Sequence, residues 1–258
     1  MYVRNYSYLG KAYAIYASSA LEVLNVEGGS YIADSHYLAD SSGYLALSVG
    51  IITYARYTFV NDVFVHGNHS GMQISGEGYI TRSTFESTGH GGIYFAHSTK
   101  TTDRYYIYVN DSEIRHCLPS GIFAGDVSNP NYSADNRAAF YIGGSAACCY
   151  ISVLMDNCII EGDKYSGVLR GSSKEHDNEL FISNSQVKAP IRKDNTDLTL
   201  TIGEGTNITK SSTLYFKHKL TTYETCGDSS IYFTNDTYRI IPDFIDKKAL
   251  VLTSAEMR

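Results

Sequence analysis

The feature that most constrains this chain is a short unit that recurs along most of its 258 residues. Each unit holds a stretch of alternating apolar residues, then a polar pair, then an apolar residue two positions further on. Self-similarity of this kind is typical of repeat architectures. The units begin at Asp34, Asn61, Arg82, Asp111, Asn157, Asn184, Gly205 and Asn235.

The spacing of the units indicates how the chain coils. Their starting positions, 34, 61, 82, 111, 157, 184, 205 and 235, lie 27, 21, 29, 46, 27, 21 and 30 residues apart. The shortest spacing predicts one coil of a parallel β-solenoid, and the longer spacings predict the same coil with inserted loops. In four units a glycine followed by an aliphatic residue comes seven residues after the apolar anchor, which is Phe64, Phe85, Ile114 or Ile160.

Apolar residues within a unit fall two positions apart, as in Tyr57 and Phe59 or in Ile93 and Phe95. A period of two is that of a β-strand with one face turned inward. No segment of similar length shows a helical period, so helical crossovers are not expected and an α/β sheet is excluded. Strands that return in parallel without helices must wind as a β-helix.

This repeat resembles the right-handed parallel β-helix of the pectate-lyase-like superfamily, the kind found in polysaccharide-degrading enzymes and phage tail spikes. The resemblance is specific for fold and covers residues 31–240. It implies that equivalent side chains stack inside successive coils. The stacked residues expected at one turn are Asp62, Ser83, Ser112, Cys158 and Ser185, and those expected in the core are Phe64, Phe85, Ile114, Ile160 and Val187.

We therefore expect an all-β fold, a single-stranded right-handed parallel β-helix (solenoid) of about eight coils over residues 31–240. Each coil buries its apolar side only against neighbouring coils, so both ends need covering. Residues 1–30 are expected to form an incomplete N-terminal coil or cap. Residues 241–258 are expected to form a C-terminal cap or a tail that contacts a partner chain.

Charge and composition argue against several classes of function. The net charge of −6 and the pI near 5.7 disfavour the basic surface that a nucleic-acid binder needs. No apolar run approaches the ~18 residues of a membrane span, so no membrane insertion is expected. The five cysteines include no C-x-x-C pair, which predicts neither a zinc site nor a redox pair.

The residue after the core anchor is charged in three successive units, which predicts a ladder of Glu86, Arg115 and Glu161, with Val65 at the same place one unit earlier. As structure, the ladder is a row of screened ion pairs worth ~0–1 kcal/mol each. As chemistry, its two carboxylates lie roughly 9–10 Å apart, at the upper edge of the spacing in inverting glycosidases. Arg115 between them would keep both ionised, which disfavours a general acid.

Four histidines are predicted to gather along one turn, because His66 and His116 share one position and His69 and His90 share another. A metal site would need converging imidazoles with a carboxylate or a backing acceptor, and a stack of exposed histidines is more common, so no metal is predicted. The segment from Gly89 to Gly91 is similar to the Gly-His-Gly element of polygalacturonases. The companion motifs of that family are absent, so the segment is interpreted as a turn.

Similarity to pectate lyases would imply Ca²⁺ on outward carboxylates with an Arg or Lys base. The outward positions before and at the polar pair hold Arg82, Asn110, Asp111 and Asp156. These include too few acids in adjacent coils to predict the site. No cofactor is therefore predicted, and Ca²⁺ is the one ion that the resemblance leaves open.

The largest insertion lies between the units at 111 and 157, over residues 125–150. Function concentrates on long loops carried by a rigid scaffold. Together with a second loop, 98–104, it is predicted to wall a groove over the outward side chains of Tyr94, Tyr108, Asn110 and Phe123. Aromatic faces beside amides suit sugar rings, although Tyr-rich faces also pack against sister subunits or face water.

The sequence thus predicts an extracellular glycan-processing protein, a hydrolase or lyase that cleaves or binds a polysaccharide in this groove. The alternative is a non-catalytic rod at a virion or cell surface, such as a tail spike or adhesin, of the kind that assembles as a homotrimer. The candidate catalytic residues are Glu86, Asp111, Asp126, Asp135 and Arg115. The candidate substrate-binding residues are Arg82, Tyr94, Tyr108, Asn110, Phe123, Tyr132 and Arg137.

Overall fold

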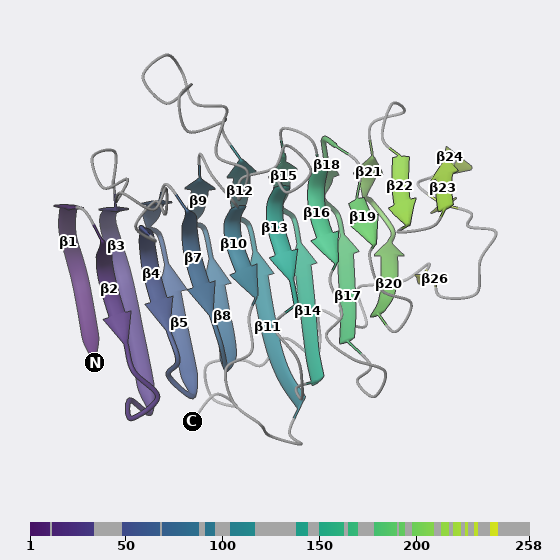
Figure 1. Cartoon of the computed structure of the whole chain (residues 1–258). Coiled ribbons are helices and arrows are strands. Elements are labelled where there is room, and N and C mark those ends of the chain that lie inside the picture. The colour runs from purple at the N-terminus through teal and green to yellow at the C-terminus, as the bar shows by residue number, and fades with distance from the viewer. Residues whose placement is uncertain are drawn as a thin grey trace, which may run out of the picture.

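The computed structural model describes residues 1–10, 12–33, 48–67, 69–87, 91–95, 104–116, 138–143, 150–162, 165–169, 178–189, 191–193, 198–208, 213–216, 219–222, 225–226, 230–231 and 238–241. Within these ranges every regular element is a β-strand, and the strands stand side by side in an elongated array (Figure 1). The all-β fold expected from the period of two is confirmed.

The middle of the array is built from repeats of three strands. The repeats are β5 (Tyr57–Asn61), β6 (Phe64–Gly67) and β7 (Ser70–Ile74); β8 (Glu77–Thr81), β9 (Thr84–Ser87) and β10 (Gly91–Phe95); β11 (Arg104–Asn110), β12 (Glu113–His116) and β13 (Ala138–Ile142); β14 (Tyr150–Asp156), β15 (Ile159–Glu161) and β16 (Tyr165–Leu169); β17 (Asn178–Ser183), β18 (Gln186–Val187) and β19 (Ile191–Lys193); and β20 (Leu198–Gly203), β21 (Asn207–Ile208) and β22 (Thr213–Phe216).

Other strands flank these repeats. Before them come β1 (Tyr2–Gly10), β2 (Tyr13–Ala17), β3 (Val23–Ala33) and β4 (Val49–Thr53), and after them β23 (Lys219–Thr222), β24 (Thr225–Cys226), β25 (Ser230–Ile231) and β26 (Tyr238–Ile241). The long strand β3 serves two positions at once, because its first half pairs with β5 and its second half with β6.

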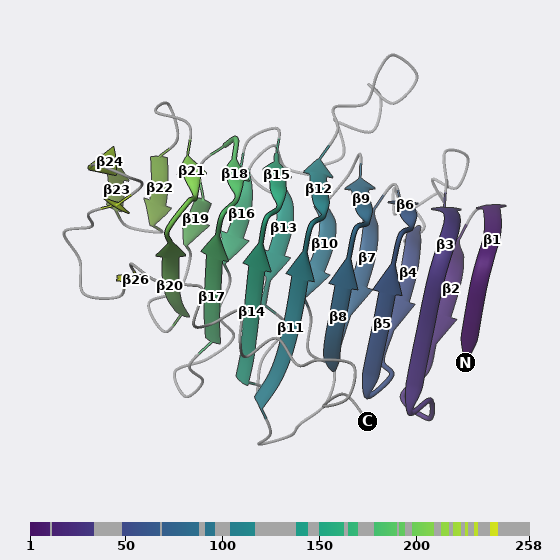
Figure 2. The same ribbon diagram turned by 180° about the vertical axis from the view of Figure 1, so that it is seen from behind.

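Each strand of a repeat pairs in parallel with the same strand of the next repeat, which gives three stacks. The first stack is β3-β5-β8-β11-β14-β17-β20-β26, the second is β3-β6-β9-β12-β15-β18-β21, and the third is β2-β4-β7-β10-β13-β16-β19-β22. Figure 2 shows the first stack in front and the third behind it. Parallel strands that return in the same order without helices are compatible with a β-solenoid.

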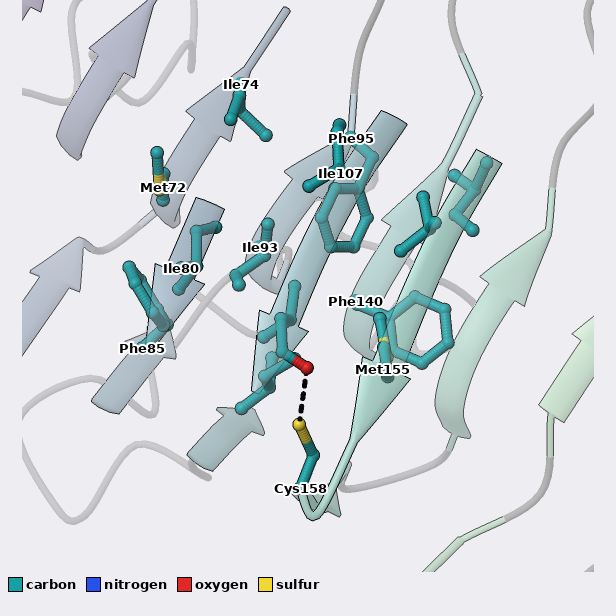
Figure 3. Close-up of a cluster of buried hydrophobic side chains, with 14 of the residues drawn as sticks. Met72, Ile74, Ile80, Phe85, Ile93, Phe95, Ile107, Phe140, Met155 and Cys158 are labelled. Carbon is teal, nitrogen blue, oxygen red and sulfur yellow. Dashed lines mark hydrogen bonds between the residues drawn. The ribbon is translucent and has the colours of Figure 1, made fainter. Parts of the chain in front are cut away.

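The core lies between the stacks, where the inward-facing residues of each strand meet their counterparts in the next repeat. Along the second stack these residues are Val65, Phe85, Ile114, Ile160 and Val187, all buried. Figure 3 shows side chains of the first and third stacks, such as Ile80 and Ile93, packing into the same interior. Burying every repeat against its neighbours supplies the main stabilisation of such a fold.

The predicted inward positions of two ladder residues, Phe64 and Asp62, are wrong by one residue. Phe64 lies opposite Thr84 on the outer face of β6 and is half-buried, whereas Val65 lies opposite Phe85 in the core. Asp62 is exposed, and Val63 takes the inward place at the turn. The segment around them contains three apolar residues within a few positions, and a register slip of one residue exchanges the two faces of a strand.

The bend between the first and second stacks is made by one residue in the left-handed conformation in each repeat. The φ angles are 56° at Asp62, 46° at Arg82, 51° at Asp111, 52° at Asn157 and 46° at Asn184. Asn and Asp tolerate this conformation because their short polar side chains bond locally. The polar pairs of the sequence therefore mark true turns of the chain.

The next residue along the chain points inward and bonds its neighbours in adjacent repeats. The amide of Ser83 donates to Oγ of Ser112 at 3.1 Å, and the amide of Cys158 donates to Oγ of Ser185 at 3.0 Å. The Sγ of Cys158 donates to the Val109 carbonyl at 3.3 Å (Figure 3), and burial raises the pKa of this thiol to about 12. The ladder expected for these serines and Cys158 is confirmed, and it satisfies backbone groups that would otherwise be buried without partners.

The predicted extent of the insertion at 125–150 is also wrong. Residues Ala138–Ile142 form β13, which pairs with β10 and β16, and Phe140 is fully buried in the core. This strand is the third strand of its repeat, whereas the sequence pattern had put the glycine and aliphatic residue of that repeat at 121–122, seven residues after Ile114. The extra length therefore falls between the second and third strands of this repeat, before residue 138. The predicted unit starts at Asp34 and Asn235 lie outside the described residues.

Candidate functional site

The charge ladder predicted on the second stack is present and longer than expected. Pairing places Glu86 beside Arg115 and Arg115 beside Glu161. On the preceding strand β6, the residue opposite Glu86 is His66 and not Val65, because the register of β6 differs by one residue from the predicted one. The His66 Nδ1 lies 3.0 Å from Glu86 Oε1, and Lys188 Nζ donates to Glu161 Oε2 at 3.0 Å.

Every carboxylate of this row is already engaged by a basic group. Along the row, His66, Arg115 and Lys188 alternate with Glu86 and Glu161, and Arg115 also donates to Glu113 on its own strand. A general acid needs a protonated carboxyl group that can approach the leaving group. The row is therefore suited to holding the strands together and poorly suited to acid catalysis.

The histidines do not gather as predicted. His66 lies beside Glu86, whereas His116 lies beside Ser87, so these two histidines do not share a position. His69 is half-buried and burial lowers its pKa to about 4. His90 lies outside the described residues. In the part of the chain that the structure describes, no group of three or more His, Cys, Asp or Glu side chains is placed to hold a metal ion.

An aromatic row follows the outer face of the first stack. The Phe59 and Tyr79 rings stack at 5.1 Å and 10°, and the Tyr79 and Tyr108 rings at 5.3 Å and 14°. Leu154 and Phe181 continue the row. Only 5% of Tyr108 is exposed, and burial raises its pKa. Because neighbouring side chains cover its ring, Tyr108 does not offer the open face predicted for a sugar.

Carboxylates on this outer face lie too far apart for a glycosidase pair. Burial raises the pKa of Glu77, which is the direction that a general acid requires. The next carboxylate in its row is Glu179, three strands away through Tyr106 and Ser152. Three strand spacings are roughly 14 Å, whereas inverting glycosidases need about 6.5–9.5 Å. Glu77 therefore lacks a second catalytic carboxylate.

A continuous band of polar side chains runs along the bend between the first and second stacks, and we call it the polar strip. Each repeat contributes the last residue of its first strand and the left-handed residue that follows. The polar strip consists of Asn61, Asp62, Thr81, Arg82, Asn110, Asp111, Asp156, Asn157, Ser183 and Asn184. Three of the predicted site residues, Arg82, Asn110 and Asp111, come together here.

Hydrogen bonds between repeats fix several groups of the polar strip. Thr81 Oγ1 donates to Asn61 Oδ1 at 2.8 Å, and Asn157 Nδ2 donates to Asp111 Oδ1 at 2.6 Å. Asn184 Nδ2 donates to Asp156 Oδ1 at 2.8 Å. The left-handed residues themselves are exposed. Asp156 and Ser183 are buried, so the exposed left-handed residues present amide, carboxylate and guanidinium groups in a fixed order. Such a mixture of donors and acceptors suits a polyhydroxylated ligand.

Arg82 breaks the pattern of the polar strip. The other residues at its place in neighbouring repeats are Asp62, Asp111, Asn157 and Asn184, which suit the left-handed conformation. An arginine at φ 46° gains no such local bond, and the conformation costs roughly 1–2 kcal/mol. Strained residues of this kind gather at functional sites. The requirements of the turn therefore do not explain why an arginine stands at position 82.

The remaining predicted residues lie elsewhere. Tyr94 lies on the third stack with its ring edge-on to Tyr141 at 6.3 Å, so the structure does not bring it together with Tyr108 on the first stack. Glu86 and Arg115 lie on the second stack. Five of the predicted residues lie outside the described residues, namely Phe123, Asp126, Tyr132, Asp135 and Arg137. The part of the predicted second loop at 98–103 lies outside them too.

Sequence reasoning missed His66 and Lys188 as partners of Glu86 and Glu161, and it missed the polar strip as a single surface. The signal for the first was available. His66 precedes Glu86 by 20 residues and Lys188 follows Glu161 by 27, which match the spacing of adjacent strands. The strip required the correct register at Asp62, which the sequence pattern placed one residue away.

Comparison with protein-family models, with curated proteins and with solved structures finds no match to this chain. The described ranges also contain no helix that could cross a membrane.

Proposed function

We propose that the chain is a right-handed parallel β-helix of about eight coils, of the kind found in the pectate-lyase-like superfamily. Three observations support this proposal: the three parallel stacks, the left-handed residue that recurs at the same bend, and the inward ladder beside it. Such rods present the same surface position many times along one axis.

On this scaffold, the proposed function is to bind a neutral polysaccharide along the polar strip without cleaving it, at an extracellular or virion surface. The observation that carries the proposal is Arg82, which is exposed and held at φ 46° in a turn where its neighbours are Asp and Asn. Its guanidinium supplies five N–H donors to a strip otherwise dominated by acceptors and amides.

A repeating ligand suits a repeating surface. The five pairs of the polar strip are spaced by one strand separation, so the strip extends for roughly 19 Å. Over that length it offers carboxylate acceptors such as Asp111, the Arg82 donors and several amides. A neutral polymer is favoured over an acidic one because Asp62 and Asp111 flank Arg82 in the turn row and would repel an anionic sugar.

Binding is favoured over cleavage because the described carboxylates are engaged or isolated. Glu86 contacts His66, Asp111 accepts from Asn157, and Glu77 has no carboxylate within catalytic reach. A hydrolase of this type needs two carboxyl groups that flank one glycosidic bond. In the strip, Asp111 and Asp156 lie on adjacent strands, but Asp111 accepts a hydrogen bond from Asn157, and Asp156 is buried and accepts from Ser183 and Asn184.

The test is affinity electrophoresis of the purified chain against a panel of neutral and acidic polysaccharides, with wild type, Arg82→Asn and Lys188→Gln compared. Asparagine suits the left-handed turn, so Arg82→Asn should fold normally. A hydrogen bond to a charged group contributes about 1.5–3 kcal/mol, which predicts at least about tenfold weaker binding. Lys188→Gln removes an exposed cation on the second stack and should bind as wild type does.

Two results would refute the proposed function. One is retention of full affinity by Arg82→Asn, and the other is an absence of binding across the whole panel. Release of reducing ends or of unsaturated products from any of the polysaccharides would refute the claim that the chain does not cleave its ligand.

A further inference from the structure

One carboxyl group on the outer face of the first stack lies among tyrosine rings. Glu77 of β8 lies opposite Tyr57 of β5, and the register that pairs Gly78 with Ile107 places Tyr106 of β11 on its other side. The hydroxyl group of Tyr79 donates a hydrogen bond to the Glu77 carboxylate. We call these four residues, Tyr57, Glu77, Tyr79 and Tyr106, the tyrosine–glutamate cluster.

The ring of Tyr106 turns one face toward Glu77. Tyr108 stacks on Tyr79, which belongs to the same strand as Glu77, at 5.3 Å and 14°. Tyr106 lies two residues before Tyr108, and the planes of these two rings differ by only 17°. A ring parallel to one whose face meets β8 also faces β8, and at this height β8 carries Glu77. Because 41% of Tyr106 is exposed, a ligand can approach the ring.

The ring on the other side of Glu77 already contacts a cation. The guanidinium carbon of Arg56 lies 5.1 Å from the centre of the Tyr57 ring. Arg56 pairs with Glu22 at 3.4 Å, so a carboxylate other than Glu77 balances its charge. Within the ranges that the structure describes, no ion pair joins a basic side chain to Glu77. Burial raises the pKa of Glu77 more than the charge of Arg56 lowers it, because the half-buried carboxylate is poorly compensated.

We propose that the tyrosine–glutamate cluster binds a quaternary ammonium cation, between the rings of Tyr57 and Tyr106 and against the carboxylate of Glu77. A ring face attracts a cation that lies within about 6 Å of its centre. Tyr57 and Tyr106 stand two strand spacings apart, so a cation midway between them is about 4.8 Å from each strand. The site is separate from the polar strip, because Glu77 begins β8 whereas Thr81 of the strip ends it.

The chemistry of the walls selects this cation over other ligands. A metal ion or a primary ammonium group needs several oxygen atoms around it, and ring faces supply none. A quaternary ammonium group has no N–H to satisfy, and aromatic walls are its usual partners in proteins. A neutral ligand of the same shape could pack on the rings but would gain nothing from the charge of Glu77. Dependence on charge therefore distinguishes the proposed cation from a neutral ligand.

The test is calorimetric titration of the full chain with choline and with its uncharged carbon analogue, in which a tert-butyl group replaces the trimethylammonium group. Choline should bind at least about tenfold more tightly than the analogue. Glu77→Gln and Tyr106→Leu should each weaken choline binding at least about fivefold. The matched control Glu179→Gln changes the next carboxylate of the same row, which accepts from Ser152, and should bind choline as wild type does.

A peptide that carries trimethyllysine is the second probe, because the same group occurs both in small molecules and on polypeptides. Tighter binding of this peptide than of choline would support the proposal and identify a polypeptide as the source of the cation. Binding of neither probe would overturn the proposal, as would equal binding of choline and its uncharged analogue. Full choline affinity in both Glu77→Gln and Tyr106→Leu, with circular dichroism identical to that of wild type, would overturn the assignment to this cluster, as would a loss in Glu179→Gln.

Discussion

Replacing Val65 by alanine should destabilise the protein far more than replacing its larger neighbour Phe64. Val65 is fully buried between Tyr31 and Phe85 of the adjacent repeats, whereas Phe64 is half-buried on the outer face of the same strand. Val65→Ala removes two buried carbon atoms at about 0.8 kcal/mol each and leaves a small cavity. The expected loss in free energy of unfolding is about 2 kcal/mol for Val65→Ala, against less than about 1 kcal/mol for Phe64→Ala.

Urea denaturation followed by circular dichroism measures both values, provided that the slope of the transition is unchanged. The comparison is informative because the sequence pattern predicts the opposite order. A phenylalanine in the core would cost about 3–5 kcal/mol when cut to alanine. A loss of that size for Phe64→Ala, with a small loss for Val65→Ala, would refute the register of the second stack.

Two further predictions test individual contacts. Ser185→Ala should cost about 1–3 kcal/mol in urea denaturation, because it leaves the buried Cys158 amide without its acceptor. The exposed neighbour Gln186→Ala should change stability by less than about 0.5 kcal/mol, and equal effects would contradict the inward ladder. The pKa of His69 is about 4 when folded and near 6.5 when unfolded, so the unfolded chain binds the extra proton and stability should fall as the pH drops from about 6.5 to 4. Denaturation midpoints at pH 7 and pH 5 should differ less in His69→Gln than in wild type, and an unchanged difference would contradict the assigned burial.

Much of the architecture could be predicted from the sequence, because burial and turn stereochemistry both leave a mark on it. The period of two gave the strands, and the spacing of the polar pairs gave their parallel return. Phe85, Ile114 and Ile160 were placed correctly, since each follows its turn residue at the same distance. Phe64 was misplaced because the unit was started at Asn61, whereas the left-handed residue equivalent to Arg82 is Asp62, and a shift of one residue exchanges the two faces of a strand.

The candidate site was harder to predict, for physical reasons that differ from one residue to another. Arg82, Asn110 and Asp111 came together because the repeat fixes their positions on the bend. The covering of Tyr108 could not be foreseen, since it depends on how tightly Tyr79 and Leu154 pack against it in neighbouring repeats. Residues 138–142 were predicted to belong to a loop, because a strand of five residues within a long insertion shows little periodicity of its own.

The most direct test of the account is disulfide formation between positions 66 and 86. The pairing of β6 with β9 places His66 opposite Glu86 on one outer face, at a backbone spacing of about 4.8 Å that lies within the range of a disulfide. Under mild oxidation, His66→Cys combined with Glu86→Cys should form a bond between these two positions, as identified by peptide mapping with mass spectrometry. Val65→Cys combined with Glu86→Cys should not, because Val65 faces the core; a bond in this second pair alone would contradict the stacked register on which the account depends.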